Sequence, residues 1–366
     1  MSTPGALFAG LMSGTSLDGV DAVVADFSTP HPRIVSSAFV AYPAALRQDL
    51  LSLNAAGHDE LHRSAGISVK LAHLYAQATQ DALSNHGLTA DQICAVGCHG
   101  QTVRHQPALG YSLQLNHPAL LAELTGITVV ADFRNRDIAA GGQGAPLVPA
   151  FHDQILRAAD EHRVVLNIGG ISNVTDLAPG RPTRGFDTGP GNMLLDAWAA
   201  RHLGTPFDAG GRWAAQGRLD AGLLARLLDH PFLALAAPKS CGREEFNLDW
   251  LDTQLPTGLD AADVQATLLE LTARSIVDAT LRECGAPQRL LVCGGGVHNA
   301  TLMSRLGALL PGSKVVSTAE FGVSPDYLEA LAFAWLARCC ITGTSGNLPQ
   351  VTGARGPRVL GAIYPA

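Results

Sequence analysis

One local pattern, an apolar strand followed by a glycine-rich turn and a second apolar strand, occurs twice in this chain. The first copy surrounds residues 10–21, and the second spans residues 164–177 with Gly169 and Gly170 at its turn. Glycine accepts positive φ and lets a ligand approach the backbone closely, so the N–H groups of such turns can cradle an anion. Two ordinary hairpins are the alternative, but the recurrence favours a phosphate-binding function.

The first turn carries polar side chains as well as glycines. The hydroxyls of Thr15 and Ser16 can add hydrogen bonds to a phosphate, and Asp18 and Asp21 offer carboxylates suited to a hard cation that accompanies phosphate. We therefore predict a phosphate and metal site at this turn.

Each copy of the pattern is followed by a third strand and by helices. The expected strands cover residues 7–12, 20–27, 34–42, 93–98, 127–130, 164–168, 173–177, 185–192, 290–293 and 359–364. The expected helices cover residues 61–86, 151–159, 193–202, 261–283, 299–310 and 327–339. Repetition of one unit predicts a two-domain α/β protein whose halves face each other across an interdomain cleft. Two unrelated α/β domains are the alternative.

The length of 366 residues also suits two domains. We place the first at residues 1–140 and the second at 141–366, with a tail from 343 that can pack on either one. The turn at Gly294, Gly295 and Gly296 follows a buried strand of the second domain and is suited to hold a nucleoside.

Composition limits the partners and the compartment. The net charge of −7, without a basic run, argues against nucleic acid, and no apolar run reaches the roughly 18 residues of a membrane span. The seven cysteines contain no C-x-x-C pair and indicate reduced thiols in the cytoplasm.

Several familiar site motifs do not fit. The chain has three lysines and no G-x-x-x-x-G-K-[ST] loop, and no G-x-G-x-x-G follows the first strand. His58 and His62 have a spacing that can bind zinc, but the glutamate of H-E-x-x-H is displaced, so a solvated helix face is favoured.

Asp187 is the strongest candidate for a catalytic group. It ends a predicted strand in the sequence Phe-Asp-Thr-Gly-Pro-Gly-Asn, where proline and glycines fix the backbone. A carboxylate held in this way suits a general base acting on water or a sugar hydroxyl. The alternative is that Asp187 or Thr188 caps the following helix.

Other polar residues also follow strand ends. Arg134 and Arg136 suit bidentate recognition of a carboxylate, or they belong to a surface ion-pair cluster. His99 and Gln101 can bind a polar ligand or be satisfied within their loop. Glu329 opens an apolar helix, where a glutamate commonly complements the helix dipole.

Taken together, blocks over nearly the whole chain resemble the anhydro-N-acetylmuramic acid kinase family: residues 10–21, 97–103, 132–149, 166–173, 186–198, 293–297 and 329–337. The resemblance implies the two-domain actin/hexokinase/Hsp70-like fold, a duplicated ribonuclease H-like arrangement. It also implies the reaction. ATP phosphorylates O6 of 1,6-anhydro-N-acetylmuramic acid while water opens the anhydro bridge, giving N-acetylmuramic acid 6-phosphate in peptidoglycan recycling.

The resemblance gives the candidate residues their roles. Asp187 would activate the water, and Arg134, Arg136, His99 and Glu329 would bind the sugar, the arginines at its lactyl carboxylate. The predicted ATP site, with Mg²⁺ on Asp18 and Asp21, comprises Gly14, Thr15, Ser16, Leu17, Asp18, Gly19, Val20, Asp21, Gly169, Gly170, Gly294, Gly295 and Gly296. A homodimer is also implied. A nucleotide-binding regulatory module, or a kinase for another sugar on the same fold, remains an alternative.

Overall fold

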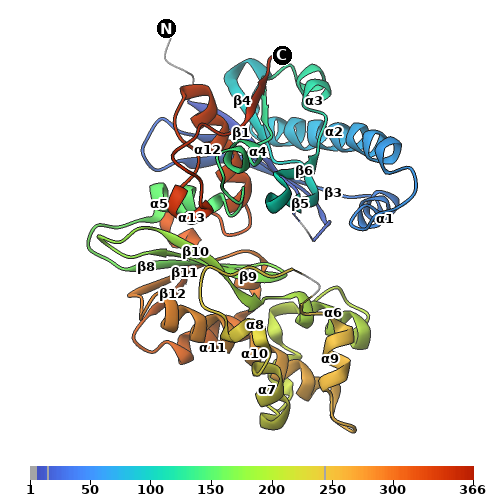
Figure 1. Cartoon of the computed structure of the whole chain (residues 1–366), viewed down its shortest axis with the longest axis vertical. Helices are drawn as coiled ribbons and strands as arrows, with labels where there is room; N and C mark the ends of the chain where they lie inside the picture. The colour runs from blue at the N-terminus through green and yellow to red at the C-terminus, as the bar shows by residue number, and fades with distance from the viewer. Residues whose placement is uncertain (1–5, 15, 243–244) are drawn as a thin grey trace. The chain divides into compact units, whose positions relative to one another are not determined.

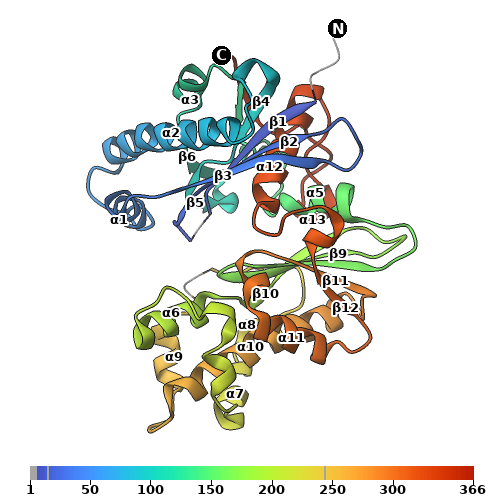
Figure 2. The same cartoon turned by 180° about the vertical axis from the view of Figure 1, so that it is seen from behind.

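The computed structural model describes residues 6–14, 16–242 and 245–366. The chain forms two compact α/β units, coloured in Figures 1 and 2 from blue at the N-terminus to red at the C-terminus. Unit 1 comprises residues 1–155 and 327–366, and unit 2 comprises residues 156–326. Each unit is built around its own sheet.

Unit 1 contains a six-stranded sheet in the order β13-β7-β4-β1-β2-β3 and a separate two-stranded hairpin. Strands β1, β2 and β3 pair antiparallel, whereas β1, β4 and β7 pair parallel. The strands are β1 (Leu7–Met12), β2 (Gly19–Asp26), β3 (Arg33–Ala41), β4 (Ile93–Cys98), β7 (Val129–Ala131) and β13 (Ala362–Tyr364), and the hairpin is β5 (Gln101–Gln106) with β6 (Tyr111–Leu115). The helices are α1 (Ala44–Ser52), α2 (Glu60–Ser84), α3 (Pro118–Thr125), α4 (Asn135–Ala139), α5 (Val148–Leu156), α12 (Leu328–Thr342) and α13 (Pro349–Thr352).

The two faces of the unit 1 sheet are covered differently. On one face, Ala9 and Leu11 of β1 enter a core cluster with Leu71 of α2. On the other face, glycine lets α12 approach the strands directly, because a Cβ at Gly10 or Gly97 would overlap the α12 backbone. This close contact packs residues 330–334 of α12 directly on β1 and β4.

Unit 2 contains a five-stranded sheet in the order β10-β9-β8-β11-β12. Its strands are β8 (Arg163–Ile168), β9 (Ile171–Leu177), β10 (Arg184–Pro190), β11 (Arg289–Cys293) and β12 (Lys314–Ser317). Its helices are α6 (Met193–Leu203), α7 (Ala221–Leu228), α8 (Pro231–Ala234), α9 (Leu248–Gln254), α10 (Ala261–Glu283) and α11 (Ala300–Leu309). A core cluster joins the inner face of β8 and β11 to α6, α7, α10 and α11, which lie on one side of the sheet in Figure 1.

The two sheets share one topology. In unit 2, β8, β9 and β10 pair antiparallel, as β1, β2 and β3 do in unit 1. The strands β8, β11 and β12 pair parallel, as β1, β4 and β7 do in unit 1. The repeat predicted from the two glycine turns is therefore present as a duplicated strand order.

The division into units differs from the expected boundary. Residues 141–155 and 327–366 cluster with unit 1, so the chain leaves unit 1, forms unit 2 and returns. The tail from residue 343 also joins unit 1, where β13 pairs with β7. Within the described residues, no helix is both long enough and apolar enough to cross a membrane.

Candidate functional site

The β1–β2 turn of unit 1 is fastened to the end of β4. The amide of Gln101 donates to the Gly14 carbonyl at 3.1 Å, and the hydroxyl of Tyr42 donates to Gln101 at 3.2 Å. Ser13 donates to the Gly100 carbonyl at 3.2 Å. Gln101, the first residue of β5, is thus bonded to two distant segments and ties the β1–β2 turn to β5.

The predicted phosphate residues of unit 1 divide between this turn and β2. Ser16, the left-handed Leu17 (φ 59°) and the exposed Asp18 lie in the turn after Gly14. The structure places Gly19, Val20 and Asp21 in β2. Thr15 lies outside the described residues.

A divalent metal has a limited set of protein ligands here. Among the described residues, no group of three or more His, Cys, Asp or Glu is placed to hold an ion. The two carboxylates predicted to hold the ion lie on the exposed Asp18 of the turn and on Asp21 of β2. That set fits Mg²⁺, which commonly takes one or two carboxylates and completes its shell with water and substrate phosphates.

His99, Arg134 and Glu329 come together at the same end of the unit 1 sheet. His99 follows β4, Arg134 directly precedes α4, and Glu329 lies in the first turn of α12. Arg134 donates to Nε2 of His99 at 2.8 Å and to the Gly144 carbonyl at 2.8 Å. The His99 ring lies 4.7 Å from the Phe333 ring, centroid to centroid, at an interplanar angle of 40°.

This cluster places the charged guanidinium of Arg134 beside the neutral imidazole of His99. Burial, and then the Arg134 charge, hold the pKa of His99 well below its ordinary value. Because Nε2 accepts from Arg134, the neutral ring carries its proton on Nδ1. Burial lowers the pKa of Arg134 to about 10, and the nearby Glu329 opposes that shift. Arg134 therefore stays charged at neutral pH and suits an anionic ligand group.

Arg136, by contrast, is exposed on α4 and is not part of this cluster. The two arginines were equivalent candidates for a carboxylate ligand, and the structure gives buried partners to Arg134. Neither residue's position in the sequence distinguishes them, because the contacts of Arg134 come from distant segments.

Asp137 is a structural residue that sequence reasoning left unassigned. Its carboxylate is fully buried and accepts from the Gly144 N–H, Asn347 and Thr352, at 2.8, 2.6 and 2.8 Å. It thereby ties the C-terminal tail to the loop whose Gly144 carbonyl receives Arg134. An acidic residue shortly before a run of glycines was the only local signal.

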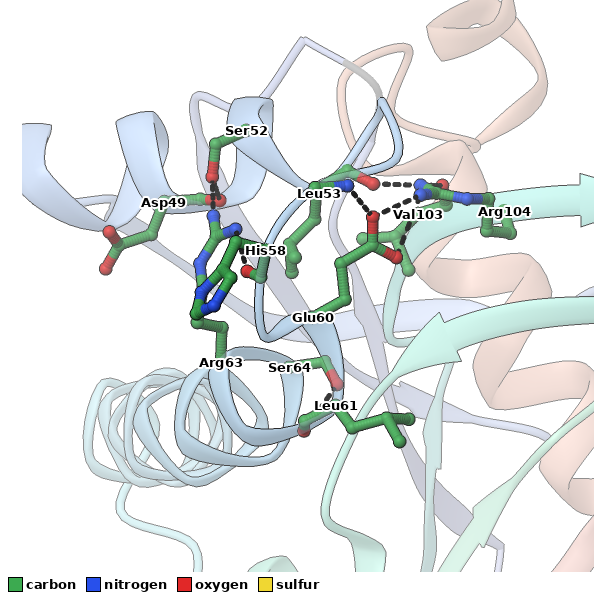
Figure 3. A network of polar contacts seen from close by, with 11 residues as sticks. Asp49, Ser52, Leu53, His58, Glu60, Leu61, Arg63, Ser64, Val103 and Arg104 are labelled. Carbon is green, nitrogen blue, oxygen red and sulfur yellow. Dashed lines mark hydrogen bonds and ion pairs between the residues drawn. The ribbon is translucent and has the colours of Figure 1, made fainter.

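The histidine pair with zinc-like spacing belongs to no group of three or more His, Cys, Asp or Glu among the residues that the structure describes. His58 precedes α2 and His62 lies within it, and both are exposed. The polar network around them joins Glu60 to Arg104 at 3.2 Å and Arg63 to the His58 carbonyl at 3.3 Å (Figure 3). Arg63 also donates to the Ser52 hydroxyl, so the network fastens the start of α2 to α1 and to β5.

In unit 2, three glycine-containing turns meet at the carboxyl end of β8. The carbonyls of Gly169 and Gly170 accept the N–H groups of Asn192 and Gly191, both at 2.8 Å. Within the described residues, neither Gly169 nor Gly170 donates its own N–H to a backbone carbonyl. Such N–H groups at a turn suit an anion.

The third turn lies against the other two. Gly294 has φ 77°, and a Cβ there would overlap the Asn167 side chain and approach the Ile168 carbonyl at 2.8 Å. Gly295 and Gly296 begin a short 3₁₀ turn after β11. The predicted glycine positions of unit 2 therefore form one backbone-walled surface.

Asp187 lies within β10, at a β-bulge opposite Asn173 of β9. A bulge redirects side chains at the end of a strand and is common beside active sites. Helix α6 begins at Met193 with Asn192 as its N-cap residue, so Asp187 is not the helix cap. Burial raises the pKa of Asp187 to about 6, against the opposing effects of the Cys241 N–H and Lys239. A carboxyl group with that pKa suits proton transfer near neutral pH.

A segment that sequence reasoning overlooked contacts Asp187. The Asp187 N–H donates to the Lys239 carbonyl at 3.0 Å, and the Cys241 N–H donates to Asp187 Oδ2 at 3.0 Å. The only signal in the sequence was that Lys239 is one of just three lysines, and the structure shows that it is buried.

Two units of one strand topology, each with glycine turns at the carboxyl end of its parallel strands, define the duplicated ribonuclease H-like class to which actin-, hexokinase- and Hsp70-like proteins belong. A family model described as anhydro-N-acetylmuramic acid kinase matches residues 6–366. The chain belongs to the anhydro-N-acetylmuramic acid kinase family.

Individual relatives agree with this assignment. The anhydro-N-acetylmuramic acid kinase of Thiobacillus denitrificans is 55% identical over 363 residues, covering 98% of this chain and 97% of the relative. That of Pseudomonas putida is 52% identical over 363 residues, covering 99% and 100%. Among solved structures, a ROK family glucokinase from Streptomyces griseus aligns with TM-score 0.44 and 14% identity over 91% of this chain and 99% of that one. That similarity is too distant to bear on the activity.

Proposed function

We propose that this protein is an ATP-dependent kinase that opens 1,6-anhydro-N-acetylmuramic acid with water and phosphorylates its O6. The observation that carries the proposal is the match to the family along nearly the whole chain. The geometry of Asp187 supports it, since a half-buried carboxyl group with a raised pKa is what activation of water requires.

Asp187 acts as the general base. It takes a proton from water, the water oxygen bonds to C1 of the sugar, and the bond between C1 and O6 breaks. O6 takes the γ-phosphoryl group of ATP, and ADP leaves. Because the phosphoryl group traps the departing O6, no second catalytic carboxylic acid is needed, unlike in ordinary glycosidases.

Arg134 binds the lactyl carboxylate of the sugar. A guanidinium that keeps its charge while half-buried gives a strong, charge-assisted hydrogen bond to a carboxylate. His99 and the Gly144 carbonyl orient the guanidinium plane, and Glu329 balances its charge. In this role Arg136 contributes little.

ATP is held by backbone N–H groups at the β1–β2 turn of unit 1 and by the glycine turns of unit 2. Asp18 and Asp21 hold Mg²⁺, which supplies neutralisation of phosphate charge when bound. We further propose that the protein works in the cytoplasm as a homodimer, which sedimentation velocity can check.

Product analysis tests the reaction. The protein is incubated with ATP, Mg²⁺ and the anhydro sugar and followed by ³¹P and ¹³C NMR. We expect phosphate on O6 together with a free hydroxyl at C1. Phosphorylation with an intact bridge would refute the coupled reaction, and ATP binding without sugar-dependent ADP release would favour a regulatory module. Acceptors with and without the lactyl group identify a kinase for another sugar.

A further inference from the structure

Lys239 is a buried cation in unit 2 whose ammonium group is bound by α8. Its residue is 8% exposed, and Nζ donates to the carbonyls of Phe232 and Leu233 at 3.1 and 3.4 Å. Nζ also lies 4.4 Å from the centroid of the Phe232 ring. A buried ammonium is costly unless it is paired, and carbonyl oxygens with an aromatic face favour its charged form.

The backbone around Lys239 is bonded to Asp187. The Lys239 carbonyl accepts the Asp187 N–H, and two residues further on the Cys241 N–H donates to the Asp187 carboxylate, both at 3.0 Å. Residues 239–241 therefore lie alongside β10. The side chain of Lys239 fastens this segment to α8.

Helix α8 is in turn packed on β10. Gly189, two residues after Asp187, has φ 146°, and a Cβ there would approach the Leu233 side chain within 2.8 Å. Lys239, α8 and β10 thus form a closed set of contacts around the bulge that carries Asp187.

We propose that Lys239 is a positioning residue for Asp187: it clamps residues 239–241 to α8, aims the Cys241 N–H at the carboxylate and places a positive charge that favours the ionised form. The inference rests on the proposed function for the role of Asp187 as base. The contacts themselves belong to the fold of unit 2.

The charges around Asp187 agree with this role. Burial raises the pKa of Asp187, whereas the Cys241 N–H and then Lys239 lower it. Burial, followed by Arg282, lowers the pKa of Lys239, and Cys241, then Glu283 and Asp187, oppose that effect. Asn173, opposite Asp187 on β9, is neutral.

Arg282 provides a matched control. It donates to the Leu233 and Leu235 carbonyls at 3.3 and 3.2 Å, so it shares one acceptor with Lys239. Its hydrogen bonds among the described residues go to Glu283, Leu233 and Leu235, and it acts on Lys239 through its charge and not through a hydrogen bond. Removing Arg282 therefore disturbs α8 without removing the proposed clamp.

The experiment measures kcat against pH for the wild type, Lys239→Met and Arg282→Met. We expect Lys239→Met to move the acidic limb up by about one pH unit, the usual effect of losing a nearby opposite charge, and so to lower kcat about tenfold at pH 5 but only about twofold at pH 7. The KM for ATP should stay within about twofold. Arg282→Met should keep the wild-type limb. An unmoved limb in Lys239→Met, or an equal shift in Arg282→Met, overturns the proposal.

A second readout does not depend on turnover. In protein labelled with [¹⁵N]cysteine, the Cys241 amide signal, identified by its loss in Cys241→Ser, should titrate with Asp187 near pH 6. Its midpoint should rise by about one unit in Lys239→Met. If the Cys241 signal titrates as expected but no turnover is detected, the proposed function is refuted and the positioning role of Lys239 is not. If Lys239→Met does not fold, Lys239→Gln, which keeps a donor but no charge, should show the same shift. Unfolding of both variants by circular dichroism overturns the positioning role.

Discussion

The two units present the same strand ends with different chemistry. In unit 1 the turn after β1 is held by side chains, with Gln101 bonded to Gly14, and the half-buried Arg134 lies at the same end of the sheet. In unit 2 the turn after β8 is held mainly by backbone, through the carbonyls of Gly169 and Gly170, with one side-chain bond from Asn192 to the Ile168 carbonyl at 3.1 Å. One topology therefore supports a charged side-chain cluster in one copy and a backbone-walled surface in the other.

This difference follows from the residues at equivalent strands. The third antiparallel strand is β3 in unit 1 and β10 in unit 2. β10 contains a bulge and the carboxylate of Asp187, whereas the end of β3 supplies no group of the proposed site. The two units share one scaffold, but the catalytic role that we propose lies on unit 2 and the sugar-binding role lies on unit 1.

Removing the Asp187 carboxylate should have the largest effect on activity. We expect Asp187→Asn to lower kcat by about 10²–10⁴-fold, the usual contribution of a general base. Because the amide oxygen can still accept the Cys241 N–H, the fold and ATP binding should persist. Stopped assays with the anhydro sugar and a nucleotide titration measure both quantities. Unchanged turnover would remove Asp187 from its proposed role.

The raised pKa gives this variant a second signature. The folded state makes ionisation of Asp187 harder than the unfolded state does, so its charge destabilises the fold increasingly as pH rises from the ordinary value of 3.8 towards 6. Asp187→Asn is therefore expected to melt at a higher temperature than the wild type at pH 7.5, and this gain should vanish near pH 4.

A pair of glycine substitutions tests whether the two turns differ as described. Gly294→Ala places a Cβ against Asn167 and Ile168 at φ 77°, so the free energy of unfolding should fall by about 2–3 kcal/mol. At Gly14 the nearest atom to a new Cβ is Ser16 Oγ at 3.7 Å, so Gly14→Ala should fold normally. Urea unfolding measures the stabilities.

The same pair separates stability from ligand binding. If phosphate approaches the Gly14 backbone closely, Gly14→Ala should weaken ATP binding although its stability is normal, by about tenfold or 1.4 kcal/mol. Calorimetric titration with ATP and Mg²⁺ checks this. Equal ATP affinity in Gly14→Ala and the wild type would place the phosphates elsewhere.

Arg134 and Arg136 form the next matched pair. Truncating a buried charged partner typically costs about 2–5 kcal/mol, so Arg134→Met should raise the KM for the sugar at least tenfold. The exposed Arg136→Met should change it less than about twofold, within the range of surface substitutions. An acceptor without the lactyl group should be insensitive to Arg134→Met. Equal effects of both variants would show that the buried cluster does not select the carboxylate.

The sequence predicted the sheet ends well because they depend on local patterns. The short apolar runs at residues 7–12 and 93–98 form β1 and β4 with the predicted bounds. The long helical pattern at residues 261–283 forms α10. The domain boundary was less predictable. An Ala- and Leu-rich helix indicates burial but not which sheet will cover it, and α12 packs on unit 1 through Gly10 and Gly97.

The site was predicted only as far as its residues could be judged locally. The environment of Arg134 is set by Gly144 and His99, and Asp132 before it adopts the left-handed φ of 58° that no pattern indicates. Lys239 reaches the surroundings of Asp187 only because a loop after α8 returns along β10. Contacts of this kind follow from packing between distant segments.

The smallest expected effect concerns the pH dependence of the reaction, which should distinguish Asp187 in unit 2 from the His99–Arg134 cluster in unit 1. Asp187 must be ionised to act as a base, and its pKa is raised to about 6, so kcat should fall as pH drops through 6, about tenfold by pH 5. His99 remains neutral over this range because its pKa lies well below the ordinary value, and sugar binding at Arg134 should therefore stay constant. Measuring kcat and the KM for the sugar separately between pH 5 and 8 distinguishes them. A KM that rises with the same midpoint would mean that the unit 1 cluster titrates, and the division of roles between the units would be wrong.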